Sequence, residues 1–412
     1  MRLKKLYACL WSICAALGMA CAAAPAWATL HTRHVVVLVI DGARFSETLG
    51  DPSLANHPRI GHDLAAIGAI PARFDNLGQT VTVPGMSGIM TGTLQNIAND
   101  GTERPHSPTV CEYLRKFAGT PDSLVRVVAR KPKLDVLGYS DHPDYGAAYG
   151  AVTRAGFNSD LETFVEARAQ LLRYRPTFML IHLGDTDFLG HANNWPGYLA
   201  SLHLADSLVW RLWNDIQADP ALGGTTTLFV TNDHGRHSQE FGGFQNHGDV
   251  CDGCRHIMLV MAGPDTRAGY VSAAHYDQRD IARTVGYLLG FPMPLAQGWV
   301  VDDMLLEPSM PLAVPASGPL TREPAVAVYP NPTRGRTAVR LSRAAPEQAS
   351  VEILDAAGRR VATLAAAPER DGSLVWNWDG RALDGRPAAP GAYIVRVRER
   401  GRTHQARLVK LQ

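Results

Sequence analysis

The feature that most limits the folds open to this chain is a set of short apolar runs that each end abruptly in polar residues. The four clearest runs are residues 35–40, 178–183, 227–230 and 257–261. Runs this short and this rich in Val, Ile and Leu are typical of strands buried on both faces of a parallel sheet. Helical patterns lie between and after them, at residues 161–173, 198–217 and 278–289. We therefore expect an α/β fold, a doubly wound sheet with helices on both faces.

Composition and charge narrow the class of protein further. The length of 412 residues and a hydrophobic content of 46% indicate a globular protein of more than one domain. Lys+Arg 40 against Asp+Glu 39 gives a net charge of +1. This balance excludes an electrostatic grip of the whole chain on nucleic acid or on an anionic membrane.

Residues 1–28 have the three parts of a secretory signal peptide. Basic residues at positions 2, 4 and 5 precede an uncharged apolar run at 6–24, and small residues stand at positions 26 and 28. We expect cleavage after Ala28 and export to a periplasm, the cell surface or the medium. An uncleaved membrane anchor is the alternative.

Three of the six cysteines remain in the predicted mature chain, at positions 111, 251 and 254. The spacing of Cys251 and Cys254 suits a zinc half-site, a redox pair or a small disulfide loop. No second Cys pair stands in the sequence, and an exported protein meets an oxidising compartment, so a structural disulfide is the favoured interpretation. We expect Cys111 to be a buried thiol.

The chain divides into two units at a proline-rich stretch. Residues 308–324 space five prolines among small residues, which is typical of an extended linker. Residues 29–307 before it carry the α/β pattern. Residues 325–412 alternate apolar and polar side chains in short segments with Gly-containing turns, which predicts a small β-sandwich. This last segment has 15 basic and 8 acidic residues, which suits either an acidic cell-surface polymer or, as we favour, a solvated Arg-rich face.

Acidic and imidazole side chains stand at or just past the ends of the predicted strands, or in a glycine-rich loop. Ligands of open α/β sheets bind beyond the carboxyl ends of the strands. Oxygen and nitrogen donors suit Zn²⁺ or Mn²⁺, and six are too many for one catalytic ion. They suit two ions about 4 Å apart, which clamp the attacking and leaving oxygens of a phosphoryl displacement. Taken alone, each of these residues is typical of a helix cap, a turn or a structural histidine. Their joint occurrence in chain order indicates a metal site formed by Asp41, Asp187, His191, Asp233, His234 and His247.

A nucleophile candidate stands in the segment 79–92, a loop that leads into a short helix. Thr82 lies two residues before Pro84 and shortly before the pair Thr91-Gly92. With this segment the chain resembles the alkaline phosphatase superfamily over roughly residues 35–306, and its phosphodiesterase and sulfatase-like branches most closely. The motifs in family order are Asp41-Gly42, Thr82-x-Pro84, Asp187-x-x-Gly190-His191, Asp233-His234-Gly235 and His247-Gly248.

The resemblance implies two divalent cations, with Zn²⁺ expected first and Mn²⁺ as the alternative. It implies that Thr82 is the nucleophile, that a covalent phospho-Thr82 forms from a small-molecule phosphate mono- or diester, and that water then releases phosphate. Sulfatases of the superfamily convert Cys or Ser at this position to formylglycine, which disfavours sulfatase activity for a threonine. The implied ligand sets are Asp41, Thr82, Asp233 and His234 for one ion, and Asp187, His191 and His247 for the other.

Several other polar residues have open assignments. Asn96 and Asn99 are alternatives for binding a phosphoryl oxygen, and residues 99–157 are the expected place for substrate-facing loops. Two arginines, Arg44 and Arg236, could reach phosphate. Three histidines could instead support ligand imidazoles: His182, His237 and His256. For all five residues a structural role is the favoured interpretation.

The C-terminal segment resembles the Ig-like module of the flagellar hook-capping protein and the sorting domains of type IX secretion. The resemblance rests on residues 329–332, 376–381 and 390–393, among others. It implies attachment to the cell surface or contact with secretion machinery through residues 325–412. Two alternatives to an exported phosphohydrolase stay open: phosphonate hydrolysis or phosphotransfer on the same metal core, and a non-catalytic cell-surface binding protein.

Overall fold

The computed structural model describes residues 30–306 and parts of the C-terminal segment, namely residues 326–329, 333, 337–341, 349–355, 359–364, 367–368, 374–399 and 402–410. The predicted signal peptide (1–28) and the predicted linker (308–324) lie outside the described residues. Within the described ranges, no helix is both long enough and apolar enough to cross a membrane.

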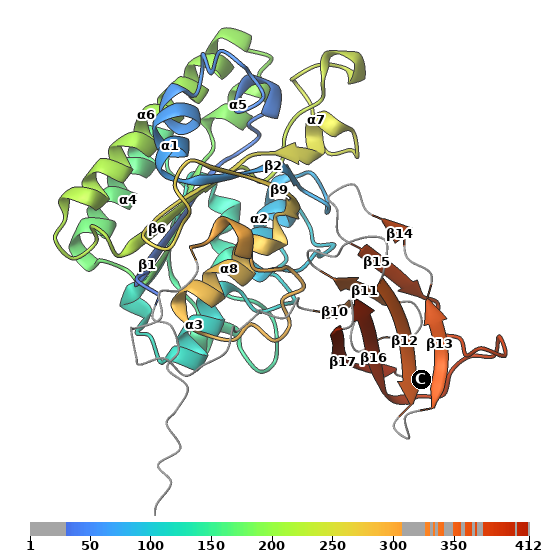
Figure 1. Cartoon of the computed structure of the whole chain (residues 1–412). Helices are drawn as coiled ribbons and strands as arrows, with labels where there is room; N and C mark the ends of the chain where they lie inside the picture. The colour runs from blue at the N-terminus through green and yellow to red at the C-terminus, as the bar shows by residue number, and fades with distance from the viewer. Residues whose placement is uncertain are drawn as a thin grey trace, which may run out of the picture.

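A mixed β-sheet forms the centre of the first unit (Figure 1). Its spatial order is β4-β3-β5-β1-β6-β8-β2-β7, and β9 also pairs with β2. The strands are β1 (His34–Ile40), β2 (Ala69–Asp75), β3 (Val125–Ala129), β4 (Val152–Ala155), β5 (Phe178–Leu183), β6 (Thr226–Thr231), β7 (His256–Ile257), β8 (Leu259–Ala262) and β9 (Tyr270–Asp277).

Strand direction changes across the sheet. Strands β4, β3, β5, β1 and β6 are parallel, as the sequence predicts. The apolar run at 257–261 was expected to be one more parallel strand; it divides between β7 and β8, and β8 runs antiparallel to β6. A run that is buried on both faces carries no signal of its direction, so the connection decides it. Strand β2 pairs antiparallel with β7 and β8 but parallel with β9.

Helices cover both faces of the sheet, and β1 shows how the sequence achieves this. Val35, Val37 and Val39 pack with α2, α3 and α8 on one face, and the alternate residues of β1 pack with α4 and α6 on the other (Figure 1). A strand buried on both sides must be apolar throughout, which explains the uninterrupted run. The helices are α1 (Ala65–Ile67), α2 (Thr82–Thr91), α3 (Val110–Ala118), α4 (Asp160–Tyr174), α5 (Asp185–His191), α6 (Trp195–Ala218), α7 (Asp252–Arg255) and α8 (Arg279–Leu289).

The three predicted helices match α4, α6 and α8 to within a few residues, and the predicted doubly wound α/β fold is confirmed. Shorter elements join the regular ones. They are the 3-10 turns η1 (Phe45–Glu47), η3 (Asp122–Leu124), η4 (Pro132–Gly138), η5 (Gly146–Tyr149), η6 (Gln239–Phe241) and η7 (Asp302–Met304), and one π-helical turn, η2 (Arg59–Leu64).

The C-terminal segment forms two antiparallel four-stranded sheets, in the orders β10-β11-β15-β14 and β13-β12-β16-β17. Trp376, Trp378, Val351 and Val395 are buried in a common apolar core. This arrangement confirms the predicted β-sandwich. The strands are β10 (Val326–Tyr329), β11 (Thr337–Leu341), β12 (Ala349–Asp355), β13 (Arg360–Leu364), β14 (Ala367–Pro368), β15 (Leu374–Trp378), β16 (Gly391–Glu399) and β17 (Arg402–Lys410).

Candidate metal centre

The carboxyl ends of three neighbouring parallel strands, β5, β1 and β6, bring the predicted ligands to one edge of the sheet. Asp41 directly follows β1, and Asp233 and His234 follow β6 after one intervening residue. Helix α5 begins just after β5 and presents Asp187 and His191 four residues apart, hence on one face. The ligand-binding edge expected for an open α/β sheet is therefore lined by acidic and imidazole groups.

Asp41, Asp233 and His234 form the first group, and none of their side chains is exposed. One ligand atom of each lies within 4.8 Å of the others. Asp41 Oδ1, Asp233 Oδ2 and His234 Nε2 are buried without a hydrogen-bond partner. His234 Nδ1 lies 2.9 Å from the carbonyl oxygen of Gly235. A carbonyl only accepts, so Nδ1 carries the proton and the lone pair of Nε2 is free for a cation.

Asp187, His191 and His247 form the second group. Asp187 Oδ1 lies 3.5 Å from His191 Nε2 and 3.3 Å from His247 Nε2, and the two imidazole nitrogens are 2.9 Å apart. His247 Nδ1 lies 2.8 Å from Thr80 O, which leaves the lone pair of its Nε2 free. The ring of His234 stacks on that of His247 with centroids 3.9 Å apart, and His234 also shares a 4.8 Å cluster with Asp187 and His247. The two groups are therefore contiguous.

Thr82 is the first residue of α2, a helix whose residues are all buried. The backbone N–H of Val83 donates to Asn99 Oδ1 at 2.9 Å, so Asn99 caps the helix beside Thr82. Asn96, the other candidate for a phosphoryl contact, instead accepts a hydrogen bond from Gln79. A helix N-terminus favours negative charge, and Thr82 is placed to present its oxygen in that field.

Lys131, which the sequence analysis did not single out, stands at the centre of the site. Its Nζ lies 2.6 Å from Asp41 Oδ2 and 2.6 Å from Asp187 Oδ2, and it donates to Thr82 Oγ1 at 3.1 Å. The lysine follows β3, whose neighbour in the sheet is β5. It lies in the segment 99–157, which was expected to face the substrate. The only local signal was the short segment 127–129 before Arg130 and Lys131, because Arg126 interrupts the apolar pattern of the strand.

The charges in the site shift one another's pKa values. Burial alone would lower the pKa of Lys131, but the nearby carboxylates of Asp41 and Asp187 outweigh burial and raise it. Burial would raise the pKa of Asp41, yet Lys131 and His182 hold it well below its usual value. Burial and the Asp41 carboxylate raise the pKa of Asp233. Burial also lowers the pKa of His191 and His247, which favours the neutral imidazole that binds metal.

Two of the supporting residues hold the acidic ligands in place. Arg236 is fully buried and pairs with Asp187, which confirms the structural ion pair expected for it. Cβ atoms added at Gly42 and Gly190 would lie 2.8 Å and 2.5 Å from the Arg236 guanidinium, so both positions need glycine. For His182 the structural interpretation was incomplete, because its Nε2 contacts Asp41 Oδ2 at 2.8 Å and so positions a predicted ligand.

The remaining candidates lie outside the two groups. Arg44 pairs with Glu47, as a structural role predicts, and the ring of His256 stacks on Phe45 at 3.6 Å. The predicted disulfide is wrong for this structure, in which Cys251 and Cys254 are both free thiols. Cys111 is buried, as expected.

The donor set fits divalent cations. Buried polar atoms in native proteins almost always have a partner, so three unpartnered ligand atoms facing one point need an explanation. Carboxylate oxygens and neutral imidazole nitrogens are the donors that Zn²⁺ and Mn²⁺ take in proteins. Asp41, Asp233 and His234 would hold one cation beside Thr82, and Asp187, His191 and His247 would hold another.

Comparison with known families identifies two segments of the chain. Residues 107–242 match the family described as type I phosphodiesterase / nucleotide pyrophosphatase. This segment contains Lys131 and the ligand candidates on α5 and after β6. Residues 331–402 match the FlgD Ig-like domain. Comparison with curated proteins yields no sequence match.

Solved structures share the fold at low sequence identity. Murine ectonucleotide pyrophosphatase / phosphodiesterase 5 has a TM-score of 0.51 at 14% identity, covering 66% of this chain and 100% of that one. A 2-O GAG sulfatase has a TM-score of 0.53 at 11% identity, covering 85% of each chain. The phosphonate monoester hydrolase of Agrobacterium radiobacter has a TM-score of 0.50 at 12% identity, covering 92% of this chain and 89% of that one.

These findings confirm both resemblances predicted from the sequence. The first unit has the alkaline-phosphatase-like fold, and the C-terminal unit is an Ig-like sandwich. Together with the family match, they support a hydrolase that acts on phosphate esters.

Proposed function

We propose that this chain is an exported, metal-dependent phosphohydrolase in which Thr82 is the nucleophile. The observation that carries the proposal is the convergence of Asp41 Oδ1, Asp233 Oδ2 and His234 Nε2, all buried and unpartnered, beside a threonine at a helix N-terminus. A threonine hydroxyl is a weak nucleophile in water and needs such surroundings to react. Two divalent cations, Zn²⁺ first and Mn²⁺ second, are the cofactors that these donors suit.

When bound, two such cations withdraw charge from the phosphoryl oxygens and favour deprotonated oxygens. The chain's own residues supply the rest. Lys131 Nζ donates to Thr82 Oγ1, and α2 adds its partial positive charge, so both stabilise negative charge on that oxygen. A bond from Thr82 Oγ1 to phosphorus forms as the bond from phosphorus to the leaving oxygen breaks, and the proton lost from the Thr82 hydroxyl is balanced by the proton that the leaving alcohol takes up. Water then cleaves the phospho-Thr82 ester and restores the hydroxyl group.

The substrate class follows from the family match as a further part of the proposal. The matched family is described as a phosphodiesterase, which favours a diester of a small organic alcohol as the first substrate to assay. Chromogenic nitrophenyl diesters, monoesters, phosphonates and sulfates form a suitable panel. We expect turnover of the phosphorus esters, loss of that turnover on chelation, and its return with Zn²⁺ or Mn²⁺. Turnover of sulfate esters alone would contradict the proposal.

Replacement of the nucleophile tests the covalent step. Thr82→Ala should lower kcat by about 10³-fold or more, as removal of a nucleophile does in other hydrolases. Thr82→Ser keeps an oxygen nucleophile and should retain part of the activity. The exposed Thr363 in β13 of the Ig-like module is a matched control, because Thr363→Ala removes a hydroxyl outside the unit that carries the ligand groups. Phosphate trapped on Thr82 by acid quench, seen by mass spectrometry, would support the intermediate; full activity of Thr82→Ala would exclude it.

We also propose export through residues 1–28 and attachment or sorting through the Ig-like module. The N-terminal pattern supports the first point, and the FlgD Ig-like match supports a non-catalytic role for the module. N-terminal sequencing of the protein from a secreting host should give a first residue of Thr29. A chain that keeps Met1 and stays in the cytoplasm would contradict export.

A further inference from the structure

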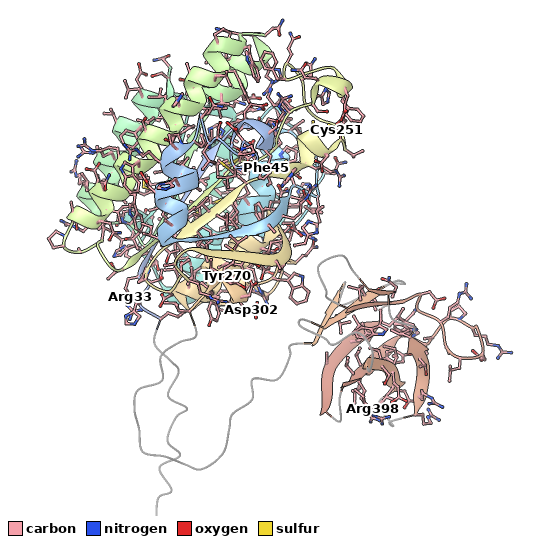
Figure 2. The ribbon with its side chains drawn as sticks, turned by 45° about the horizontal axis from the view of Figure 1, so that its top comes forward. Arg33, Phe45, Cys251, Tyr270, Asp302 and Arg398 are labelled. Carbon is pink, nitrogen blue, oxygen red and sulfur yellow. The ribbon has the colours of Figure 1, made fainter. Side chains whose placement is uncertain are left out.

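A second set of ligand-type side chains lies outside the candidate metal centre, in the loop between β6 and β7. His237, Asp249, Cys251 and Cys254 each offer one ligand atom, and these four atoms all lie within 4.8 Å of one another. Figure 2 labels Cys251, which lies in the loop beside the short helix α7. The two cysteines alone form a half-site; the fold adds one imidazole and one carboxylate. We name these four residues the knuckle cluster.

The arrangement inside the knuckle cluster is that of ligands around a common cation. His237 Nε2 lies 3.1 Å from Asp249 Oδ2, yet it is buried and makes no hydrogen bond. Two ligands of one tetrahedral zinc ion, each about 2.0–2.2 Å from the metal, lie about 3.3 Å apart. The distance between His237 Nε2 and Asp249 Oδ2 therefore suits coordination of one shared zinc ion. Since His237 Nε2 makes no hydrogen bond, its lone pair is available for that ion.

The backbone around the cluster is shaped to donate hydrogen bonds to sulfur. The backbone N–H of Cys254 bonds to the Cys251 sulfur, and the N–H of Gly248 bonds to the Cys254 sulfur. Burial raises the pKa of both thiols, to about 12 for Cys254, and these hydrogen bonds oppose that shift. The thiolate is the form that binds metal, and a coordinated cation itself deprotonates the thiol. The other oxygen of Asp249 accepts from the N–H of Cys251 at 2.9 Å, which fixes the carboxylate.

Close backbone contacts hold the two halves of the cluster against each other. The N–H of Gly235 donates to Cys254 O at 2.8 Å. A Cβ atom at Gly235 would lie 2.0 Å from Gly253 O, and one at Gly253 would lie 2.5 Å from Arg236 O. Both positions therefore require glycine, and this close approach places His237 over the turn that carries the cysteines.

From these contacts we infer that the knuckle cluster is a structural zinc site, separate from the two cations proposed for catalysis. Four protein ligands of two sulfurs, one nitrogen and one oxygen close the tetrahedral shell of Zn²⁺ and leave no open position, as in structural sites. Thiolate ligands also select Zn²⁺ over Mn²⁺ or Mg²⁺. The inference does not depend on the proposed activity.

The site would order the loop that carries His247. Thr80 Oγ1 donates to Asp249 O at 2.7 Å, and His247 Nδ1 lies 2.8 Å from Thr80 O. Thr80 stands two residues before Thr82. Its two contacts therefore connect the knuckle cluster both to His247, a ligand candidate of the metal centre, and to the segment that leads into α2. Loss of the structural zinc should therefore loosen His247 without removing it.

Cobalt substitution of the full chain tests the inference by a readout independent of activity. We expect Co²⁺ to give a sulfur-to-cobalt charge-transfer band in the near ultraviolet, and Cys251→Ser/Cys254→Ser to abolish it and lower bound zinc by one ion per chain. Cys111→Ser is the matched thiol control and should keep the band. The double variant Asp41→Asn/Asp187→Asn alters the metal centre and should keep the sulfur-to-cobalt band as well. A failure of the proposed catalytic function can therefore be told apart from a failure of the structural zinc site.

A second pair of variants guards against misfolding of the double cysteine variant. His237→Ala and Asp249→Asn keep both sulfurs and should each weaken zinc binding at the knuckle cluster by about 10-fold or more. Two results would overturn the inference. One is a Cys251–Cys254 disulfide in the purified protein, seen as a mass two hydrogens lower, that persists when zinc is supplied during folding. The other is a cobalt spectrum unchanged by loss of both cysteines.

Discussion

Replacing Lys131 with methionine tests whether this lysine balances the charge of the metal centre. Its Nζ lies 2.6 Å from a carboxylate oxygen of Asp41 and 2.6 Å from one of Asp187, and only 19% of the side chain is exposed. Methionine keeps the approximate length of the side chain and removes its charge. Without a cation in the site, the variant therefore leaves Asp41 with His182 and Asp187 with Arg236, which compensate the buried carboxylates only in part.

The magnitude follows from these distances. Two unit charges 2.6 Å apart attract by about 6 kcal/mol at an effective dielectric constant of about 20. Desolvation offsets part of this attraction, and removal of one partner of a buried pair lowers stability by about 3–5 kcal/mol. Because Lys131 keeps some contact with water, we expect about 3 kcal/mol for the chelator-treated protein. With zinc bound, the cations neutralise the carboxylates in place of the lysine. The difference in unfolding free energy between wild type and Lys131→Met should then fall below about 1 kcal/mol.

Urea unfolding of wild type and Lys131→Met, each with chelator and with zinc, measures both differences. We also expect kcat for phosphate esters to fall about 10²-fold with zinc bound, because the donor to Thr82 Oγ1 is lost. Lys116, whose Nζ donates to the Asp144 carbonyl oxygen at 2.6 Å, is the matched control, and Lys116→Met should change stability by less than about 1 kcal/mol, equally with chelator and with zinc. Equal stability of the two chelated proteins, or a loss that zinc leaves undiminished, would refute the charge-balance argument.

Three further outcomes are expected. Gly190→Ala should lower stability by about 1–3 kcal/mol in urea unfolding, because its Cβ would lie 2.5 Å from the Arg236 guanidinium; a change within 0.5 kcal/mol would show that the arginine moves at little cost. Burial and Asp185 raise the pKa of Asp160 to about 7, so the stability this group contributes is present below about pH 4 and is lost as pH rises through 7. Asp160→Asn should remove that loss. In urea unfolding, the free energy of unfolding of the variant relative to wild type should therefore be higher at pH 8 than at pH 5; the same relative value at both pH values would contradict this. Trp376→Ala should lower the stability of the Ig-like module by about 3–5 kcal/mol in calorimetry and leave turnover unchanged.

The fold could be predicted where the sequence pattern reflects burial. Strand β1 is apolar throughout because both of its faces are covered, and the matching runs at β5 and β6 reveal the parallel part of the sheet. The antiparallel direction of β8 could not be read in this way. Strand β2 escaped notice because Pro71 and Arg73 interrupt its pattern, and the structure leaves the middle of that strand partly exposed.

The candidate site could be predicted where a ligand directly follows a recognisable strand. Asp41, Asp233 and His234 satisfy that condition, and the structure brings them together. Lys131 does not, because a lysine between Arg130 and Pro132 in a charged segment resembles an ordinary surface turn. Only the three-dimensional pairing of β3 with β5 shows that this turn faces the carboxylates.

The knuckle cluster shows a different limit of sequence reasoning. Cys251 and Cys254 are visible as a pair, and export favours a disulfide for such a pair. His237 and Asp249 stand in different parts of a glycine-rich loop and share no spacing rule with the cysteines. Their approach depends on the close backbone contact at Gly235 and Gly253, which no local pattern predicts.

The complete burial of α2 has a consequence for how this protein would acquire new substrates. An oxygen at the first turn of a helix that is wedged into the core has almost no freedom to follow a ligand, so each substrate must deliver its phosphorus to a fixed point. Changes of substrate range are therefore expected to arise in the surrounding loops. Substitutions at Met86 or Ile89, buried about one and two turns beyond Thr82 on the same helix, should instead shift the reaction geometry for all substrates alike.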